Sequence, residues 1–297
     1  MNYKKIVRSR RTRFIILRLL SWVPDSLMLR IQYRIKQGIW PNFKHPQRYT
    51  EKVQLYKMHY RNPVMFQCVD KYEVRDYVKN RGLDDILVPL IGVYDDAKDI
   101  DFKQLPEKFV IKTTDGGGGN NVLICTDKTK IDWPSEILQI NGWRNLKDID
   151  PGREWAYTGM KKSRIIVEEF LESDDNDLTD YKFYCFNGKP YYCQVITGRR
   201  TKECIDFFDK QWVHQNFVGL NPGVGNAEIC PEKPSNYEEM WGLAGQLAGT
   251  FPFVRVDLYS VKGKTYFGEL TFYPASGYGE FKPDEVDFEL GAYFTGY

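Results

Sequence analysis

The 297-residue chain lacks the patterns of a secreted or membrane-spanning protein. It has no apolar run of about 18 residues and no signal-peptide cleavage pattern, so we expect no membrane crossing. Its six cysteines form no Cys-x-x-Cys pair, and several lie inside predicted strands. Buried, reduced thiols are typical of that arrangement, and we expect a cytoplasmic protein.

Histidine and the common catalytic patterns are scarce as well. The three histidines, His45, His59 and His214, lie far apart without metal-ligand spacing, so structural or exposed roles are expected. No nucleophilic triad is evident, and the GxxxxGK[ST] phosphate loop is missing.

Acidic residues are nearly absent from the first 50 positions, where twelve Lys or Arg accompany only Asp25. This part has a net charge of +11, and the rest of the chain has −9. Apolar clusters alternate with arginines here, and Pro24 interrupts them. The pattern is typical of an amphipathic helix at the inner face of a membrane, or of a helix packed on the protein with its arginines in solvent. Nucleic acid is not expected as a partner, because no recognition module accompanies the charge.

Two segments with period-2 alternation, Phe253–Tyr259 and Thr265–Thr271, flank Lys262-Gly263-Lys264 and predict a β-hairpin with a three-residue loop. The predicted pairs are Val261–Thr265, Asp257–Glu269 and Arg255–Thr271. One face of this hairpin is apolar, and the other carries the arginine, the two acids and the threonine.

Two acids directly opposite each other destabilise a sheet, and a divalent cation between them reverses that effect. Mg²⁺ takes one or two protein carboxylates and fills its other positions with water and phosphate oxygens. Asp257 and Glu269 therefore predict half of a metal–nucleotide site, the alternative being two solvated acids beside Lys262 and Lys264.

A second signal is a glycine-rich loop between two predicted strands, Phe109–Lys112 and Val122–Cys125. Consecutive glycines expose backbone N–H groups and allow close approach of a phosphate. Lys112 ends the entering strand and supplies a positive charge for that phosphate. The alternative is a loop that is merely flexible. The glycines are Gly116, Gly117, Gly118 and Gly119.

A third signal lies between these two. Ile165–Leu171 is a β-rich segment, and Asn187-Gly188 predicts a two-residue hairpin turn between Tyr181–Phe186 and Lys189–Ile196. With that turn, Lys182 shares a face with Tyr184, Tyr191 and Cys193. A lysine on such a face either extends its amine to solvent or points at an anion.

The order of these pieces resembles the ATP-grasp fold: a DK helix, a lysine strand with a glycine loop, an EEFL linker, a second lysine strand, an R-x-D strand and an E-x-[NT] strand. FVIKTTDGGGGNN, DYKFYCFNGKP and GELTFYPASG further resemble the TupA-like subgroup, named for teichuronopeptide biosynthesis and found among surface-polysaccharide genes. The resemblance covers roughly residues 40 to 297. It implies an α+β fold in which two lobes hold ATP between antiparallel sheets, preceded by a short helical N-terminal region.

Three parts of the chain are expected on this basis. Residues 1–65 form the basic helical region, with helices at 12–22, 25–37 and 50–60. Residues 66–104 hold a helix over 66–81, closed by Gly82, and the strand Ile86–Tyr94. Residues 105–297 form the ATP-grasp domain, in which Glu239–Ala248 is a helix.

The resemblance also implies a role for each matching position. Lys71 of the DK pair and Lys112 contact phosphates, and the four glycines form a lid over them. Arg255 stabilises the acyl-phosphate and the tetrahedral intermediate, and Arg255 and Lys112 are the implied catalytic residues. Asp257 and Glu269 hold Mg²⁺, with Thr271 where many relatives have asparagine. The remaining implied nucleotide contacts are Glu168, Glu169, Phe170 and Leu171 at the adenine, Asp175 or Asp177 at the ribose, and Lys182.

The implied reaction is ATP-dependent ligation of a carboxylate to an amine through an acyl-phosphate, on a surface polysaccharide or its precursor. Arg199 and Arg200 either meet a substrate carboxylate or form surface ion pairs, and Ser276 lies in a second candidate acceptor loop. Two alternatives remain. One is a glycosyltransferase, for which Asp95-Asp96 and Asp174-Asp175 lack the DxD context. The other is an inactive nucleotide-binding scaffold, suggested by Thr271.

Overall fold

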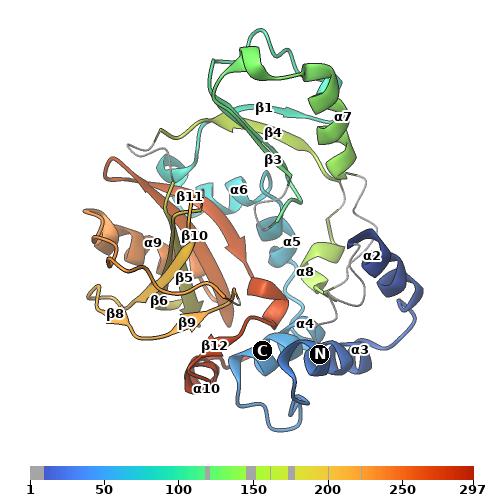
Figure 1. The fold of residues 1–297 in the computed structure, drawn as a ribbon, viewed down its shortest axis with the longest axis vertical. Helices are drawn as coiled ribbons and strands as arrows, with labels where there is room; N and C mark the ends of the chain where they lie inside the picture. The colour runs from blue at the N-terminus through green and yellow to red at the C-terminus, as the bar shows by residue number, and fades with distance from the viewer. Residues whose placement is uncertain are drawn as a thin grey trace.

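The computed structural model describes residues 10–117, 121–144, 152–160, 162–172, 178–199, 201–221 and 223–297. They form two lobes, each built on an antiparallel sheet, with a group of N-terminal helices beside them (Figure 1). Gly118, Gly119, Asp175, Asp177 and Arg200 of the predicted site lie outside the described residues.

The small lobe is a four-stranded sheet in the order β1-β4-β2-β3. Its strands are β1 (Leu90–Tyr94), β2 (Phe109–Thr113), β3 (Val122–Cys125) and β4 (Ile165–Glu169). Helix α7 (Trp133–Trp143) packs on this lobe, where Trp133 stacks on Phe102 at 4.1 Å between ring centroids. Short 3₁₀ turns connect the elements: η2 (Ala97–Asp99) and η3 (Lys128–Lys130).

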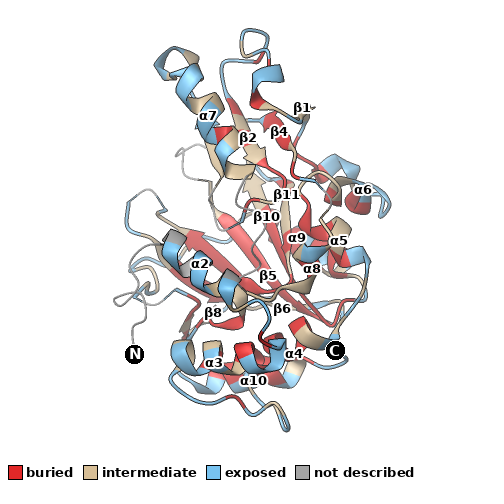
Figure 2. Cartoon of the chain, turned by 90° about the vertical axis from the view of Figure 1, so that its right-hand side faces the viewer, coloured by how far each residue is buried: buried red, intermediate tan, exposed pale blue. Residues whose placement is uncertain are grey.

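The large lobe is a six-stranded sheet in the order β11-β10-β5-β6-β7-β8. Its strands are β5 (Asp180–Phe186), β6 (Lys189–Thr197), β7 (Cys204–Phe208), β8 (His214–Gln215), β10 (Phe253–Val261) and β11 (Lys264–Thr271). Its strands are largely buried in Figure 2, because helices cover the sheet. The flanking elements are α9 (Tyr237–Ala248), α10 (Glu285–Tyr293), η5 (Pro274–Gly277) and the pair β9 (Val218–Gly219) and β12 (Phe281–Lys282).

The N-terminal helices are α2 (Arg10–Leu19), α3 (Asp25–Gln37) and α4 (Tyr49–His59). The prediction of α3 is confirmed, and the other two differ by a few residues at their ends. Helix α4 belongs to the main core, where the buried ring of Tyr49 meets Phe253 at 5.2 Å and Phe294 at 6.2 Å. Helix α8 (Trp155–Thr158) lies between α4 and α5.

The single helix expected over 66–81 is wrong, since the chain forms α5 (Val64–Val69) and α6 (Val74–Lys79) with a break between them. Asp70 is extended (φ −87°, ψ 121°), and its carboxylate accepts hydrogen bonds from the backbone N–H groups of Tyr72 and Glu73. An acid in that position caps the turn over residues 71–73, which leads into α6. The break therefore has a sequence cause, and Lys71 lies in it.

The strand expected to begin at Ile86 begins at Leu90 instead, because Ile86 ends the 3₁₀ turn η1 (Asp84–Ile86). Pro89 has no N–H group for a strand ladder, which agrees with this later start. At the other side of β1, strand β4 ends at Glu169 rather than at Leu171.

The β10–β11 hairpin has the predicted pairs at its functional end but not at its turn. Lys262 (φ 52°) and Gly263 (φ 77°) form a two-residue turn, so Val261 pairs with Lys264 and not with Thr265. A bulge at Gly268 then shifts the register by one residue. The pairs Asp257–Glu269 and Arg255–Thr271 are therefore confirmed, although the loop length was wrong.

A bulge also changes the β5–β6 hairpin. The predicted turn at Asn187 and Gly188 is present, but the register shifts between Tyr184 and Cys185. Lys182 therefore pairs with Gln194, and the predicted shared face of Lys182 and Cys193 is wrong, because Cys193 pairs with Phe183. Lys182 and Gln194 are both buried.

The Gly268 bulge leaves no room for a side chain, since a Cβ there would lie 2.9 Å from the backbone oxygen of Asp257 and 3.1 Å from the Tyr259 ring. We expect Gly268→Ala to lower the free energy of unfolding by about 1–3 kcal/mol in urea titrations. The matched control is Gly242→Ala on α9, where no atom lies within 4 Å of the new Cβ, and it should raise stability by about 0.5–1 kcal/mol. If Gly268→Ala is as stable as wild type, the bulge has room for a side chain and this interpretation is contradicted.

Candidate active site

A cleft of about 540 Å³ lies between the two lobes and brings the predicted residues together. The small lobe contributes Lys112, Gly116 and Gly117, and Lys71 enters from the break between α5 and α6. The predicted residues of the large lobe that line it are Lys182, Arg199, Arg255, Asp257, Glu269, Thr271 and Ser276.

The acids at the floor of the cleft lie on one face of β10 and β11. Arg255 donates two hydrogen bonds to Asp257, from Nε to Oδ1 and from Nη2 to Oδ2, each 2.7 Å long. Its Nη2 also donates to Thr271 Oγ1 at 3.1 Å, and the Thr271 hydroxyl donates to Glu269 Oε1 at 3.1 Å. One guanidinium and one hydroxyl thus connect the two carboxylates in register.

Two lysines complete the neutralisation of these acids. Lys182 Nζ donates to Asp257 and lies 3.2 Å from Asp180 Oδ1. Lys71 Nζ donates to Glu269 Oε2 at 3.3 Å and to the Gly116 carbonyl. Lys71 therefore bridges the two lobes, because its backbone N–H also donates to the Thr114 carbonyl in the loop after β2.

These cations determine the protonation state of Glu269. Burial by itself raises the pKa of this carboxyl, but the charges of Lys71, Lys182 and Arg255 outweigh that effect and lower the pKa to about 2. The pKa of Arg255 is raised above its usual range, because its attraction to Asp257 exceeds the opposing effect of burial. Both groups are charged at neutral pH.

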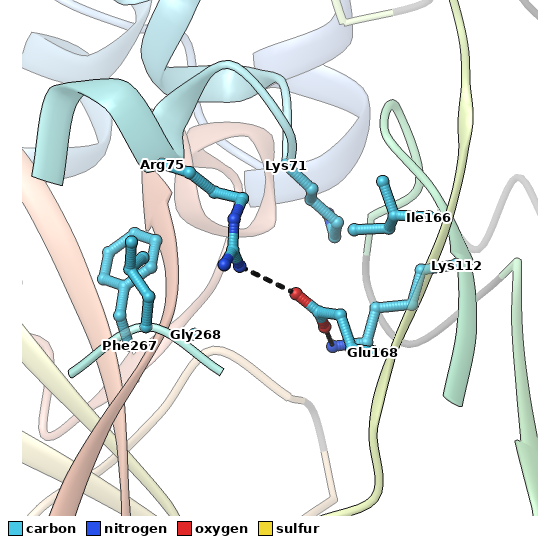
Figure 3. Close-up of a pocket in the computed structure, with 8 residues that line it drawn as sticks. Lys71, Arg75, Lys112, Ile166, Glu168, Phe267 and Gly268 are labelled. Atoms are coloured by element: carbon cyan, nitrogen blue, oxygen red, sulfur yellow. Dashed lines mark hydrogen bonds and ion pairs between the residues drawn. The ribbon is translucent and has the colours of Figure 1, made fainter. Parts of the chain in front are cut away.

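Lys112 is held by Glu168, as Figure 3 shows. Its Nζ lies 2.8 Å from Glu168 Oε2, and Arg75 Nη1 approaches the other oxygen at 3.4 Å. The three side chains surround a small cavity of about 10 Å³ next to Gly268 and Phe267. The sequence reasoning missed Arg75, although it follows the DK pair by one helical turn.

Three other predicted nucleotide contacts, Glu169, Phe170 and Leu171, follow Glu168 at the end of β4. Among the described residues, the lining of the cleft does not include them. Their role at the adenine stays a prediction. Arg199 lies in the cleft and forms an ion pair with Asp180 (Nη2 to Oδ2, 2.9 Å), so it takes part in the charge network of Lys182.

Ser276 lies in a strained turn that helix α4 holds in place. Ala275 (φ 48°) and Ser276 (φ 56°) have left-handed backbones, which cost energy for residues other than glycine. The fully buried Lys57 donates to the Ser276 carbonyl at 2.7 Å, and it lies 2.9 Å from Ser276 Oγ and 3.0 Å from the Gly152 carbonyl. Gln54 Nε2 donates to the Gly277 carbonyl at 2.9 Å.

Sequence reasoning missed Lys57 and Gln54. The available signal was their position on the predicted helix 50–60, one turn apart, beside the apolar residues Val53 and Tyr56. A polar pair on the core side of a helix needs buried partners. Here the partners are carbonyl groups of the turn that borders the cleft.

The oxygen ligands of the cleft fit Mg²⁺. Two carboxylates and a hydroxyl, on Asp257, Glu269 and Thr271, are hard ligands of the kind this ion prefers. No group of three or more His, Cys, Asp or Glu side chains suited to a metal occurs within the described ranges. Such a site leaves most coordination positions to water or phosphate, as Mg²⁺ sites commonly do.

The chain is similar to one known protein family and to several solved structures. A family model described as TupA-like ATPgrasp matches residues 51–295, and none of the curated proteins matches the chain significantly. Similar solved structures include D-alanine–D-alanine ligase from Bacillus anthracis (18% identity over 70% of this chain and 58% of that chain, TM-score 0.41). Others are D-alanine–D-alanine ligase from Helicobacter pylori (12%, 83% and 69%, TM-score 0.46) and L-amino acid ligase from Bacillus licheniformis (14%, 71% and 42%, TM-score 0.41). The chain thus spans 58% of the length of the Bacillus anthracis enzyme.

The hydrogen bonds of Lys57 to Ser276 predict a local effect on the turn over residues 273–278. Lys57→Met leaves buried carbonyls without donors and should lower the free energy of unfolding by about 1–3 kcal/mol. It should also speed amide hydrogen exchange at residues 273–278. Lys52→Met is the matched control, because Lys52 Nζ on the same helix donates to the carbonyls of Gly291 and Phe294 instead. Faster amide exchange at residues 273–278 in Lys52→Met, or an unchanged exchange rate there in Lys57→Met, would contradict this role of Lys57.

The low pKa of Glu269 predicts a pH dependence of stability. Its ion pairs stabilise the fold fully above the ordinary glutamate pKa of about 4.5, and this contribution is lost as the pH falls toward 2. Wild type should therefore exceed Glu269→Gln in unfolding free energy at pH 7 and 5, by an amount that shrinks at pH 3. Urea titrations at the three pH values test this, with the exposed Glu232→Gln as control. A difference that grows on acidification would refute the assignment.

Proposed function

Because this chain belongs to the TupA-like ATP-grasp family, we propose that it is an ATP- and Mg²⁺-dependent carboxylate–amine ligase. The observation that supports this most is the shared face of β10 and β11, where Arg255 contacts both the Asp257 carboxylate and Thr271. Asp257 and Glu269 pair directly across the two strands. An arginine beside two opposed acids is suited to a bound polyphosphate and its metal.

ATP fits the cleft by charge. Lys71, Lys112 and Lys182 come from three separate segments and all line it, and each is held by a carboxylate. Phosphate oxygens can replace those carboxylates as partners of the lysines. Asp257, Glu269 and Thr271 would hold Mg²⁺, which supplies positive charge to the phosphate oxygens when it is bound.

The proposed reaction has two steps. An oxygen of the substrate carboxylate forms a bond to the γ-phosphorus of ATP while the bond from that phosphorus to the β–γ bridging oxygen breaks, which releases ADP. The amine nitrogen then forms a bond to the acyl carbon, phosphate leaves with the carbon–oxygen bond pair, and the nitrogen releases one proton to solvent. In this proposal the guanidinium of Arg255 stabilises the negative charge that develops on the oxygen bonded to this carbon. The main tasks of the protein are positioning and charge stabilisation.

The substrate belongs to the proposal as well. We infer a carboxylate of a surface polysaccharide or its precursor, such as a uronic acid, and an amino acid or other amine as acceptor. We assign these groups to the part of the cleft lined by Arg199, Ser276 and Glu154, here called the acceptor side. We also infer that the enzyme works at the inner face of the cell membrane and contacts it through the basic N-terminal region.

Calorimetric titration with ATP tests this proposal. In excess Mg²⁺, Asp257→Asn/Glu269→Gln should weaken ATP binding by at least about tenfold, because two oxygen ligands lose their charge. With EDTA in place of Mg²⁺ the difference should vanish or reverse, since the freed Arg255, Lys71 and Lys182 still attract phosphate. Asp76→Asn, an exposed acid on α6, is the control and should bind as wild type.

Further readouts separate the alternatives. Phosphate release that requires ATP, a uronate and an amine together would support the ligase. Tight binding of UDP-glucuronate without any response to ATP would contradict it and favour a glycosyltransferase. ATP binding without phosphate release for any acceptor pair would contradict catalysis and favour an inactive scaffold.

A further inference from the structure

The outer faces of α2 and α3 form an exposed apolar surface. Of the fifteen large hydrophobic residues that are exposed in the described chain, nine fall between Ile15 and Trp40. Leu19 and Trp22 are 70% and 79% exposed. Figure 2 shows α2 and α3 at the outside of the molecule. A concentration of apolar side chains of this kind marks an interaction site rather than scattered surface residues.

Helix α3 is apolar on two opposite sides, and the residues that the structure describes cover only one of them. Its buried residues are Met28, Leu29 and Tyr33. Leu27, Ile31 and Ile35 are exposed, and their spacing of four residues places them on one face of the helix. The covered side explains why α3 folds against the body, whereas the exposed face has no role in that packing.

The charge of this region identifies the partner as anionic. Residues 1–50 carry a net charge of +11, and their single acid, Asp25, is already paired with Arg153 at 2.7 Å. A second copy of this chain would bring two such positive regions together, which is unfavourable. A nucleic acid would satisfy the charge but would offer little apolar surface to Leu27, Ile31 and Ile35. An anionic lipid surface satisfies both properties.

The helices are suited to lie on such a surface rather than to cross it. No helix within the described residues is long and apolar enough to span a bilayer. Helix α3 has 13 residues, or roughly 20 Å at about 1.5 Å per residue. We therefore propose that the outer face of α2 and α3, around Leu19, Trp22, Leu27, Ile31 and Ile35, docks on an anionic lipid surface.

This docking would place the acceptor side of the cleft next to the lipid. Gln32 of α3 accepts a hydrogen bond from the Tyr278 hydroxyl at 2.8 Å, and Lys36 lies 4.0 Å above the same ring. Tyr278 directly follows the turn that holds Ser276. One helix thickness, about 10 Å, therefore separates the docking face from that turn. A carboxylate or amine substrate attached to a lipid could enter the cleft from this side, an inference that rests on the proposed ligase function.

Arg153 connects the same region to a second segment that lines the cleft. Its guanidinium donates to the carbonyls of Leu20 at 2.9 Å and Ser21 at 3.3 Å, where α2 ends. The next residue, Glu154, lines the cleft. The docking face and the acceptor side are therefore connected through two separate sets of contacts.

Flotation of the full chain with lipid vesicles tests the docking surface. The chain should bind vesicles that contain phosphatidylglycerol, bind pure phosphatidylcholine vesicles much less, and release from both as salt is added. Ile31→Glu/Ile35→Glu should reduce binding at least about tenfold. Leu138→Glu is the matched control, because Leu138 on α7 of the small lobe is 73% exposed, and it should bind as wild type.

Two further measurements keep the result unambiguous. Tryptophan fluorescence should be quenched by brominated lipids in wild type and much less in Trp22→Phe. The Ile31→Glu/Ile35→Glu variant should bind Mg²⁺–ATP in solution as wild type does, which separates loss of docking from misfolding and from failure of the ligase proposal. Absence of wild-type binding to anionic vesicles, an equal loss in Leu138→Glu, or a lipid-free dimer that the double variant dissociates would overturn the inference.

Discussion

The opposition of Asp257 and Glu269 across two neighbouring strands is the constraint on which the rest of the structure depends. Two carboxylates in register destabilise a sheet unless positive charge lies between or beside them. In this chain Arg255, Lys182 and Lys71 supply that charge from three different elements. Because Lys71 also contacts the loop of the small lobe through Gly116 and Thr114, neutralising the acids also ties the two lobes together.

The same arrangement explains how several lysines can lie close together in one cleft. Lysines without anions beside them would repel one another, yet each lysine here has a carboxylate partner. Glu168 has this role for Lys112, and Arg75 holds Glu168 from its other side. In the proposed function, phosphate oxygens of ATP replace these carboxylates as partners of the lysines. Glu168 then becomes a positioning residue for Lys112 as well as part of the predicted adenine linker.

The functional face of the hairpin could be predicted from the sequence, because strict alternation fixes which side chains share a face. The turn could not, since Lys262 and Gly263 form a shorter loop and the Gly268 bulge restores the register further along. The shorter turn and the bulge each shift the strand register by one residue, and the two shifts cancel at Asp257. From the sequence, the break at Asp70 could be predicted only from the capping tendency of this acid, because the helical pattern around it is otherwise continuous. The contact of Lys57 with Ser276 joins residues 219 positions apart, and no local pattern reports such a pairing.

The contacts of the N-terminal helices reach the turn that borders the cleft. Helix α4 fixes the strained turn at Ser276 through Lys57 and Gln54, and α3 holds Tyr278 just beyond it. These helices therefore support one border of the cleft from outside the two lobes. Since α3 carries an exposed apolar face opposite to these contacts, the helix that supports this border is also the one that the docking proposal places on the lipid surface.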